Sequence, residues 1–240
     1  GSQISGVVQE VSCDFNTAVK KGQLCAKIDP RPFQRAVDQA RANLANAKAT
    51  LEQHEASLAY VKASYERSST LVQRGVVSKD AFESVQSNFG QARAQIEVDK
   101  AVIAQRQAEL GIAELNLGYT DIVAPIDGVV LSRRVAVGET LATSFQTPTL
   151  FVIATDLRRL QLIANVSESD IGGLKPGDQA SFMVKAFPNR SFNAQVSQIR
   201  QAPEGNRLDV NYAVVLDVDN AEQLLKPGMS AAVRLVSADR

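Results

Sequence analysis

The sequence predicts an elongated α+β protein of several domains, in which an antiparallel helical hairpin interrupts one β domain and a second β domain follows. Residues 30–118 are almost free of Gly and Pro and consist of helix formers, whereas the segments before and after them alternate like β-strands. The two flanking segments also resemble each other. Only 5% of the 240 residues are aromatic and Trp is absent, so several slim modules are expected rather than one large core.

Charge and hydropathy exclude several classes of function. The chain has 26 basic (Lys and Arg) and 26 acidic residues, so its formal net charge is zero and the basic stripe that binds nucleic acid is not expected. No run of about 18 apolar residues occurs, and the opening GSQISG has neither the pattern of a signal peptide nor a lipid-attachment Cys. We therefore do not expect this stretch to cross a membrane.

Two half-motifs bracket the helical zone. Residues 1–29 alternate as VVQEV, a polar turn and QLCAKID, and are closed by Pro30. Residues 119–157 return to strands with YTDIVAPIDGVVL and TPTLFVIA. ISGVVQEV before the hairpin is echoed by IDGVVLSR after it, and VKKGQL is echoed by VAVGETL. We expect the two halves to come together in one β domain.

The period of residues 30–118 predicts a coiled coil. Apolar or small residues recur in alternating steps of three and four from Val37 to Tyr65. The same steps recur from Phe82 to Leu117, with Asp99 and Arg106 as polar exceptions. Members of the two series pair so that their residue numbers sum to 150. Two such seams face each other in an antiparallel hairpin, whose arms of about 40 residues are roughly 60 Å long.

Capping signals place the break between the two helices. Asp29 and Pro30 suit the N-cap and the first residue of the first helix, and Gly75 suits a left-handed residue just after its end. Ser78 is placed to cap the returning helix. The break in the helical pattern is thus expected to be a hairpin tip near 72–78.

Residues 158–240 read as a second β domain with an internal repeat. LKPG occurs at 174–177 and again at 225–228, each time with an Ala six positions after the Leu. Because Lys-Pro-Gly favours a tight turn, we expect two structural turns without a binding role. The segment DVNYAVVLDVD at 209–219 alternates as a strand and completes this domain.

The bracketing halves resemble a biotinyl/lipoyl-type domain that is split into residues 1–29 and 119–157. A true carrier joins its halves by a tight turn that presents a Lys for acylation. Here the coiled coil of residues 30–118 takes the place of that turn, so a lipoyl or biotin carrier is disfavoured and no cofactor is expected.

The chain as a whole resembles the periplasmic adaptor proteins, also called membrane fusion proteins (HlyD/AcrA superfamily). The stretches that carry the resemblance are VKKGQL, YTDIVAPIDGVV, VSESDIGGLKPG and LLKPGMSAAVRL. It implies that residues 158–240 form a β-barrel domain. The opening QISG, YTDIVAP and the Gln-x-Pro that starts at Gln146 are most similar to MacA-type adaptors, which serve ABC transporters.

The resemblance implies a conduit in a tripartite efflux pump. In the periplasm, the adaptor would bridge an inner-membrane transporter, of ABC type rather than proton-driven, to an outer-membrane TolC-like channel. It would form a hexamer and export a drug or small molecule. The family's membrane anchor and membrane-proximal domain are not expected in this stretch. A type I protein-secretion adaptor, usually with longer hairpins, is an alternative. A metal-efflux adaptor is less favoured, because that class would be expected to carry clusters of Met or His, and this chain has two Met and one His.

No enzymatic activity is expected. The single His, His54, lies on the coiled-coil seam opposite Ile96, where it serves as a seam filler or a register-setting polar residue. No second His exists to build a metal site or a Ser-His pair. No Walker A or GxGxxG pattern for nucleotides is present.

The expected hairpin tip holds the first candidate site. In the resembled family an Arg, a Leu four residues later and a Ser seven residues after that contact the channel, which implies Arg67, Leu71 and Ser78 here. Arg can donate a forked set of hydrogen bonds, and Leu71 with Val76 or Val77 can fill a groove. The plainer interpretations are a solvated Arg67 and a Ser78 that only caps a helix.

The resemblance also implies two further candidates. Gln146 lies in the loop from which, in MacA-like relatives, a Gln points into the channel of the ring as a one-way gate; a polar surface residue is the other interpretation. Cys13 and Cys25 take positions where related strands place apolar residues, so they are either buried thiols or a disulfide. The disulfide is favoured by an oxidising periplasm and by the closeness of neighbouring strands.

Overall fold

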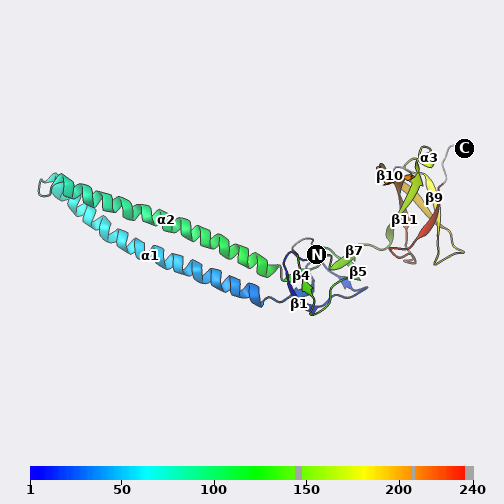
Figure 1. Ribbon diagram of the computed structural model, residues 1–240, viewed down its shortest axis with the longest axis horizontal. Coiled ribbons are helices and arrows are strands. Elements are labelled where there is room, and N and C mark those ends of the chain that lie inside the picture. The colour runs from blue at the N-terminus through cyan, green and yellow to red at the C-terminus, as the bar shows by residue number, and fades with distance from the viewer. Residues whose placement is uncertain (144–147, 207–208, 236–240) are drawn as a thin grey trace. The chain divides into compact units, whose positions relative to one another are not determined.

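The structure, a computed structural model, describes residues 1–143, 148–206 and 209–235 (Figure 1). The chain divides into two compact units, Gly1–Ile153 and Ala154–Arg240. Among the helices of the described ranges, none has the length and apolar character needed to pass through a bilayer.

The β domain of the first unit draws its strands from both sides of the hairpin. These strands are β1 (Gly6–Val11), β2 (Ala18–Val19), β3 (Leu24–Ile28), β4 (Asp121–Val123), β5 (Gly128–Arg133), β6 (Thr140–Leu141) and β7 (Phe151–Ala154). One sheet has the order β4-β3-β1-β6 and the other β2-β5-β7. Each sheet therefore combines strands that precede the hairpin with strands that follow it.

Contacts at the base of the hairpin join the two halves. Leu24 of β3 pairs with Val123 of β4, and β2 pairs with β5 in the same antiparallel sense. The amide of Ile28 donates to the carbonyl oxygen of Thr120 at 2.8 Å. Ile28, from before the hairpin, and Leu150, from after it, are buried in one apolar cluster. The predicted split β domain is confirmed.

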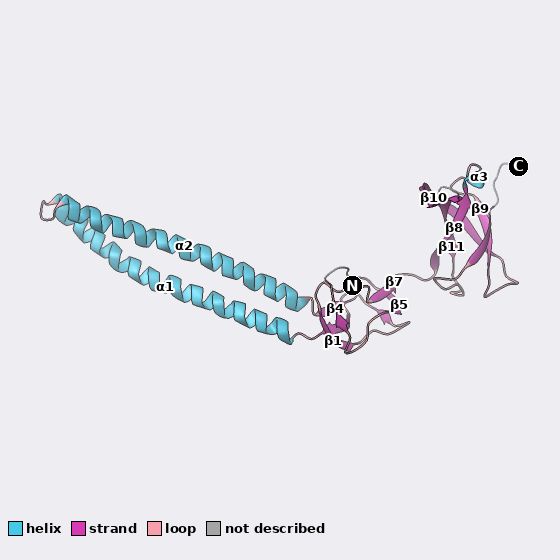
Figure 2. Ribbon diagram, in the orientation of Figure 1, coloured by secondary structure: helices cyan, strands magenta, loops and turns pink. Residues whose placement is uncertain are grey.

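The inserted hairpin consists of α1 (Arg31–Gln73) and α2 (Lys79–Gly118), which pack along each other (Figure 2). The ring of Tyr65 stacks between those of Phe82 and Phe89, with centroid distances of 5.6 and 5.0 Å. This aromatic layer lies at the level that the pairing sum of 150 predicts. The antiparallel hairpin of the predicted fold class is thus confirmed.

The polar layer of the hairpin contains a hydrogen bond that the heptad pattern did not predict. Nδ1 of His54 lies 2.6 Å from a carboxylate oxygen of Asp99, one helical turn beyond the predicted partner, Ile96. Gln95 donates to the other oxygen at 3.0 Å. Because Asp99 is only 6% exposed, its carboxylate requires hydrogen-bond donors from the protein, and His54 and Gln95 supply them. The hydrogen bond from His54 lowers the pKa of Asp99 below its ordinary value.

The start of α1 lies one residue later than predicted. Pro30, rather than Asp29, occupies the N-cap position, and no side chain caps the helix. The Asp29 carboxylate instead accepts hydrogen bonds from the Arg31 amide at 3.0 Å and from its guanidinium at 2.7 Å. This bidentate pairing with Arg31 lowers the pKa of Asp29 to about 2. The bond to the Arg31 amide satisfies a donor of the first helical turn, as the predicted capping by Asp29 would.

Within the described residues, the second unit is a five-stranded antiparallel sheet around its own core. The elements are β8 (Arg159–Ser167), α3 (Glu168–Ile171), β9 (Gln179–Val184), β10 (Phe192–Asn206), β11 (Asp209–Asp219) and β12 (Ala231–Leu235). The strand order is β12-β9-β10-β11-β8. Phe182, Val196 and Leu216 from three neighbouring strands are buried together. This is the second β domain of the predicted fold class.

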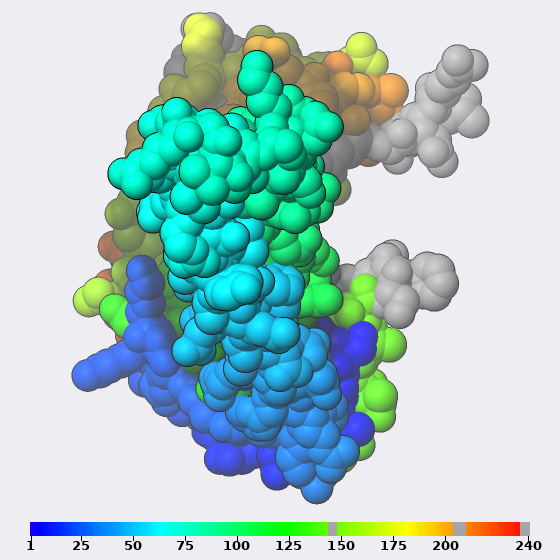
Figure 3. Space-filling view, turned by 90° about the vertical axis from the view of Figure 1, so that its left-hand side faces the viewer, coloured from blue at the N-terminus to red at the C-terminus, as the bar shows by residue number. Residues whose placement is uncertain are grey.

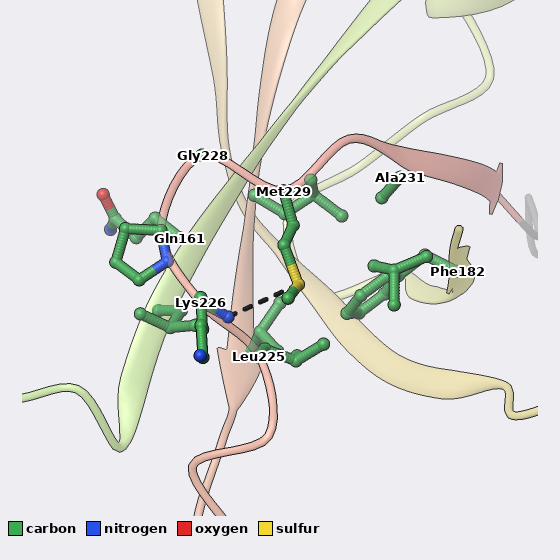
Figure 4. A pocket seen from close by; sticks show the side chains of 12 residues that line it. Gln161, Phe182, Leu225, Lys226, Gly228, Met229 and Ala231 are labelled. Carbon is green, nitrogen blue, oxygen red and sulfur yellow. Dashed lines mark hydrogen bonds between the residues drawn. The ribbon is translucent and has the colours of Figure 1, made fainter. Parts of the chain in front are cut away.

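Both Lys-Pro-Gly sequences form turns. Gly177 and Gly228 have φ values of +101° and +87°, in the left-handed region that favours glycine. The second turn lines a mainly apolar pocket of about 190 Å³ (Figure 4). There the amide of Lys226 donates to the sulfur of Met229 at 3.5 Å, and Leu225 is buried. The turn is therefore held against the core of this unit.

Candidate functional site

The hairpin tip, which Figure 3 shows end-on, is formed where α1 stops in a Schellman motif. The amide of Val76 donates to the carbonyl oxygen of Leu71 at 3.0 Å, and that of Gly75 donates to Val72 at 3.1 Å. Gly75 has a φ of +70°, where a residue with a side chain would be strained. The break in the helical pattern is therefore a helix cap.

Ser78 begins the returning helix. Its hydroxyl accepts a 3.2 Å hydrogen bond from the amide of Ala81, and its extended backbone is that of an N-cap residue. Asp80 lies in the first turn, where the positive end of the helix dipole favours an acidic side chain. The capping interpretation of Ser78 is thus confirmed, and contact with a channel stays a separate prediction.

The other side chains of the tip point to a binding surface. Arg67 is exposed, and within the described residues no hydrogen bond or ion pair engages its guanidinium. Leu71 is 38% and Val76 68% exposed, while Val77 is half-buried. The tip therefore presents a forked donor beside apolar surface, which together suit a protein partner that offers carbonyl or carboxylate oxygens beside a groove.

The helix cap also places Leu71 and Val76 in a relation that the sequence reasoning missed. In a Schellman motif the residue after the left-handed Gly commonly packs on the residue five positions earlier. Gly75 itself was the signal, since it places Val76 and Leu71 in those positions. Because Val76 keeps 68% of its surface exposed, this role leaves most of the side chain accessible to a partner.

Cys13 and Cys25 form a disulfide in the structure. The sulfurs are 2.10 Å apart, the Cα atoms are 4.6 Å apart, and both residues are buried. Cys13 follows β1 and Cys25 lies in β3, so the bond closes the loop that contains β2. Since β2 pairs with β5, the disulfide fixes the segment that reaches across to the other half of the domain.

Gln146, the gating candidate, lies outside the described residues. The segment that leads to it is anchored, because the hydroxyls of Ser5 and Thr143 lie 2.9 Å apart and the Thr143 amide donates to Ser5 at 3.0 Å. The gating role of Gln146 stays a prediction. In the part of the chain that the structure describes, no group of three or more His, Cys, Asp or Glu is placed to hold a metal ion.

Two family models together match most of the chain. Residues 1–153 match the barrel-sandwich hybrid domain of RND membrane fusion proteins, and residues 161–239 match the CusB-like β-barrel domain. This chain belongs to the membrane fusion protein family. The first match includes the whole hairpin, so the insertion of α1 and α2 into a β domain is the arrangement of this family.

Individual relatives also support the assignment of this chain to the membrane fusion protein family. The macrolide export protein MacA of Escherichia coli O157:H7 is 32% identical over 239 residues, which are 100% of this chain and 64% of MacA. The pyoverdine export membrane fusion protein PvdR of Pseudomonas aeruginosa is 32% identical over 99% of this chain and 66% of its own length. The chain thus spans about two thirds of the length of these relatives.

A solved structure supports the same placement. The crystal structure of MacA from Actinobacillus actinomycetemcomitans is similar with a TM-score of 0.89 and 29% sequence identity. The similarity covers 98% of this membrane fusion protein and 72% of that chain. The predicted resemblance to the adaptor family, and to MacA within it, is confirmed.

Proposed function

We propose that this membrane fusion protein is the periplasmic adaptor of a tripartite efflux pump, which bridges an inner-membrane transporter to an outer-membrane TolC-like channel. The family supports an adaptor without enzymatic activity of its own. Two relatives are named for the export of a macrolide and of pyoverdine, which supports a small molecule rather than a protein as cargo. The cargo would pass through an oligomeric ring, proposed to be a hexamer, with no covalent step.

The proposed inner-membrane partner is an ABC transporter. The similarity to MacA supports this choice over a proton-driven pump, because the resemblance to MacA-type adaptors implies a transporter of that class. Co-purification of the full-length adaptor from membranes, with identification of the bound transporter by mass spectrometry, tests the choice. Recovery of a proton-driven pump instead would overturn the transporter class and leave the adaptor role standing.

The observation that carries the proposal is the position and surface of the hairpin tip. Arg67, Leu71 and Val76 are exposed at the far end of helices of 43 and 40 residues. At 1.5 Å per residue, helices of these lengths span about 60 to 65 Å. A long arm whose end holds an unengaged Arg and exposed apolar side chains suits docking to a distant partner.

Two substitutions at the tip test this function. Arg67→Asp reverses the charge of the forked donor and Leu71→Ser removes apolar surface, so each should abolish binding to the channel and efflux. Helical content and melting temperature should stay the same, since neither side chain lies on the buried seam. Arg93→Asp, the same charge change at an exposed position of α2 away from the tip, is the matched control. Normal channel binding by both tip variants would contradict the assignment.

A further inference from the structure

The two cysteines of the first unit are brought together by contacts within the first half of its β domain. β1 pairs with β3 in the antiparallel sense. Just beyond this pairing, the amides of Ser12 and Cys13 both donate to the carbonyl oxygen of Cys25, at 2.8 and 3.2 Å. All of these residues precede the hairpin. The first half of the domain therefore contains the contacts that bring the two sulfurs within bonding distance.

The residues that cover the bond come from the other half. Cys13 and Cys25 are each 1% exposed, and Ala124 and Val130, which follow the hairpin, are buried in the same cluster. A cavity of about 340 Å³ also reaches Cys25. Small-molecule sites have volumes of about 300 to 1,000 Å³, so a cavity of this size does not admit the active site of another protein. Once the second half is in place, a protein cannot reach the sulfurs.

The loop that the bond closes is also the surface on which the second half docks. The amide of Asn16 donates to the carbonyl oxygen of Val130 at 2.9 Å, and that of Gly22 donates to Ala124 at 2.8 Å. Between these contacts, β2 pairs with β5. A bond that joins the two ends of the loop restricts its conformations, so less ordering is needed when the second half arrives. Oxidation before docking thus favours docking.

The hairpin separates the two halves in time as well as in sequence. Cys25 and Ala124 are roughly 100 residues apart, which at about 5 to 20 residues per second takes about 5 to 20 s to synthesise. During this interval the two thiols lack the residues that bury them in the folded domain. A disulfide forms within seconds when the oxidant is efficient and within hours when it is not. An efficient oxidant is therefore needed for the bond to form before its cover arrives.

We propose that a thiol–disulfide oxidoreductase oxidises Cys13 and Cys25 in the first half of the domain, and that the second half then docks and shields the bond. The inference goes beyond the proposed function and rests on it only for the periplasm, an oxidising compartment. The sequence contains two Cys, so the reaction required is an oxidation without reshuffling between alternative pairs. The partner is thus an oxidase of dithiols rather than a disulfide isomerase.

The reaction proceeds by two thiol–disulfide exchanges. The thiolate of one cysteine attacks the disulfide of the oxidoreductase and forms a mixed disulfide, which releases one thiolate of the enzyme. The thiolate of the other cysteine attacks the mixed disulfide, so that the Cys13–Cys25 bond forms and the second enzyme thiolate leaves. Two electrons pass to the enzyme, and the two protons of the adaptor thiols end on its two thiolates. The enzyme therefore leaves as a dithiol.

Refolding of this chain from its reduced, unfolded state tests the order of the two events. Val130→Asp places a charge at a fully buried position of the second half and should prevent docking. With a purified, oxidised oxidoreductase of the Cys-X-X-Cys type present from the start, this variant should form the bond within about twofold of the rate of the original chain. Val196→Asp, the same change at a buried position of the second unit, is the matched control.

Reduction of the finished bond tests the shielding. Reduced thioredoxin should break the bond about tenfold faster in Val130→Asp than in the original chain, because access to the sulfur controls the exchange. Val196→Asp should be reduced as slowly as the original chain, since its core belongs to the other unit. Equal reduction of Val130→Asp and the original chain, or fast reduction of Val196→Asp, would overturn shielding by the second half.

Two further outcomes of the refolding experiment overturn the proposal. A bond that forms about tenfold more slowly in Val130→Asp than in the original chain would mean that the complete domain brings the cysteines together, so that oxidation follows docking. Oxidation by dissolved oxygen alone, at the rate seen with the enzyme, would remove the need for an oxidoreductase.

Trapping in cells tests the partner with the full-length adaptor. An oxidoreductase whose second active-site Cys is replaced by Ala retains its mixed disulfides. It should be trapped on the adaptor and not on the double variant Cys13→Ala with Cys25→Ala, and absence of a trapped complex would overturn the partner. Failure of this proposal leaves the tip assignment unchanged. Normal efflux in Arg67→Asp would instead overturn the docking tip and leave the order of oxidation and docking standing.

Discussion

Single residues at the tip divide into those that fix the backbone and those that are accessible to a partner. Gly75 supplies the left-handed conformation and Ser78 the N-cap, so changes there would disturb the hairpin itself. Leu71 takes part in both, because its carbonyl oxygen is used in the cap while its side chain is 38% exposed. Among the described residues, no hydrogen bond or ion pair engages the exposed Arg67 guanidinium, so this position is the most direct test of docking.

The disulfide between Cys13 and Cys25 predicts that denatured, unreduced protein contains no titratable thiol. The bond closes a loop with a sequence separation of 12, and the constraint that it places on the unfolded chain is worth about 3 kcal/mol. Reduction should lower the free energy of unfolding of the β domain by about that amount, as measured by urea unfolding. The double variant Cys13→Ala with Cys25→Ala should not respond to reductant. Two reactive thiols in the unreduced protein would contradict the bond.

Gln146 is predicted to act on transport and not on assembly. If its side chain lines the channel of the ring, Gln146→Ala removes a polar group from the path of the cargo without changing the surfaces that hold the copies together. We expect an altered transport rate in membrane vesicles and an unchanged oligomer mass. Gln161→Ala, in the second unit, is a control of the same chemistry. A smaller oligomer in Gln146→Ala would indicate a structural role instead.

Among the elements, the hairpin takes its register from a few specific contacts within a uniform apolar seam. Tyr65 between two aromatic rings and His54 on Asp99 are each made at one level only. The remaining seam residues are mostly Ala, Leu and Val, which would pack nearly as well after a shift of one heptad. The polar layer therefore adds specificity to the hairpin, because a shifted register would take the His54 donor away from the buried Asp99 carboxylate, whereas Gln95 lies on the same helix as Asp99.

Asp99 predicts that the hairpin loses stability in acid. Its hydrogen bond from His54 holds its pKa below the ordinary 3.8, so folding favours the charged carboxylate. A lowered pKa contributes stability that is present above pH 3.8 and is lost as the pH falls through the folded value. The melting temperature followed at the helical signal should drop below about pH 4, and this drop should be smaller in Asp99→Asn. Glu55→Gln, at an exposed position of α1, is the control; an equal drop in Asp99→Asn would refute the prediction.

The same elements show which features of the fold could be predicted from the sequence. The heptad steps predicted the hairpin and the level of the Tyr65 layer, because both follow from a local period. They did not predict the hydrogen bond between His54 and Asp99, because the period indicates which positions face the partner helix and not which polar side chains bond there. Docking by Leu71 could not be derived from the residue pattern either, because the helix cap alone already explains why a residue at this position takes part in the tip. The order β12-β9-β10-β11-β8 depends on contacts distant in sequence.

In the molecule as a whole, the first unit is a small β domain that carries a long insertion. The chain enters and leaves the hairpin at adjacent points, because the amide of Ile28 donates to Thr120 at 2.8 Å. Sheet pairing continues directly below, between β3 and β4. The β domain therefore has its own core and hydrogen bonds, and the hairpin extends the chain away from that core. Phe33 in the first turn of α1 is an exception, since it packs against the core cluster of the β domain.

This arrangement predicts that the β domain folds without the hairpin. If residues 36–114 are replaced by a short Gly-rich linker, Phe33 and the ends of both helices are kept, and the entropy of closing the connecting loop changes only slowly with its length. The shortened protein should melt cooperatively, keep the Cys13–Cys25 bond and lose most of its helical circular dichroism and its binding to the channel. A second replacement, of residues 31–118, removes Phe33 as well and should melt at a lower temperature. An unfolded product from the first replacement would mean that the hairpin is part of the folding core of the unit rather than an insertion into it.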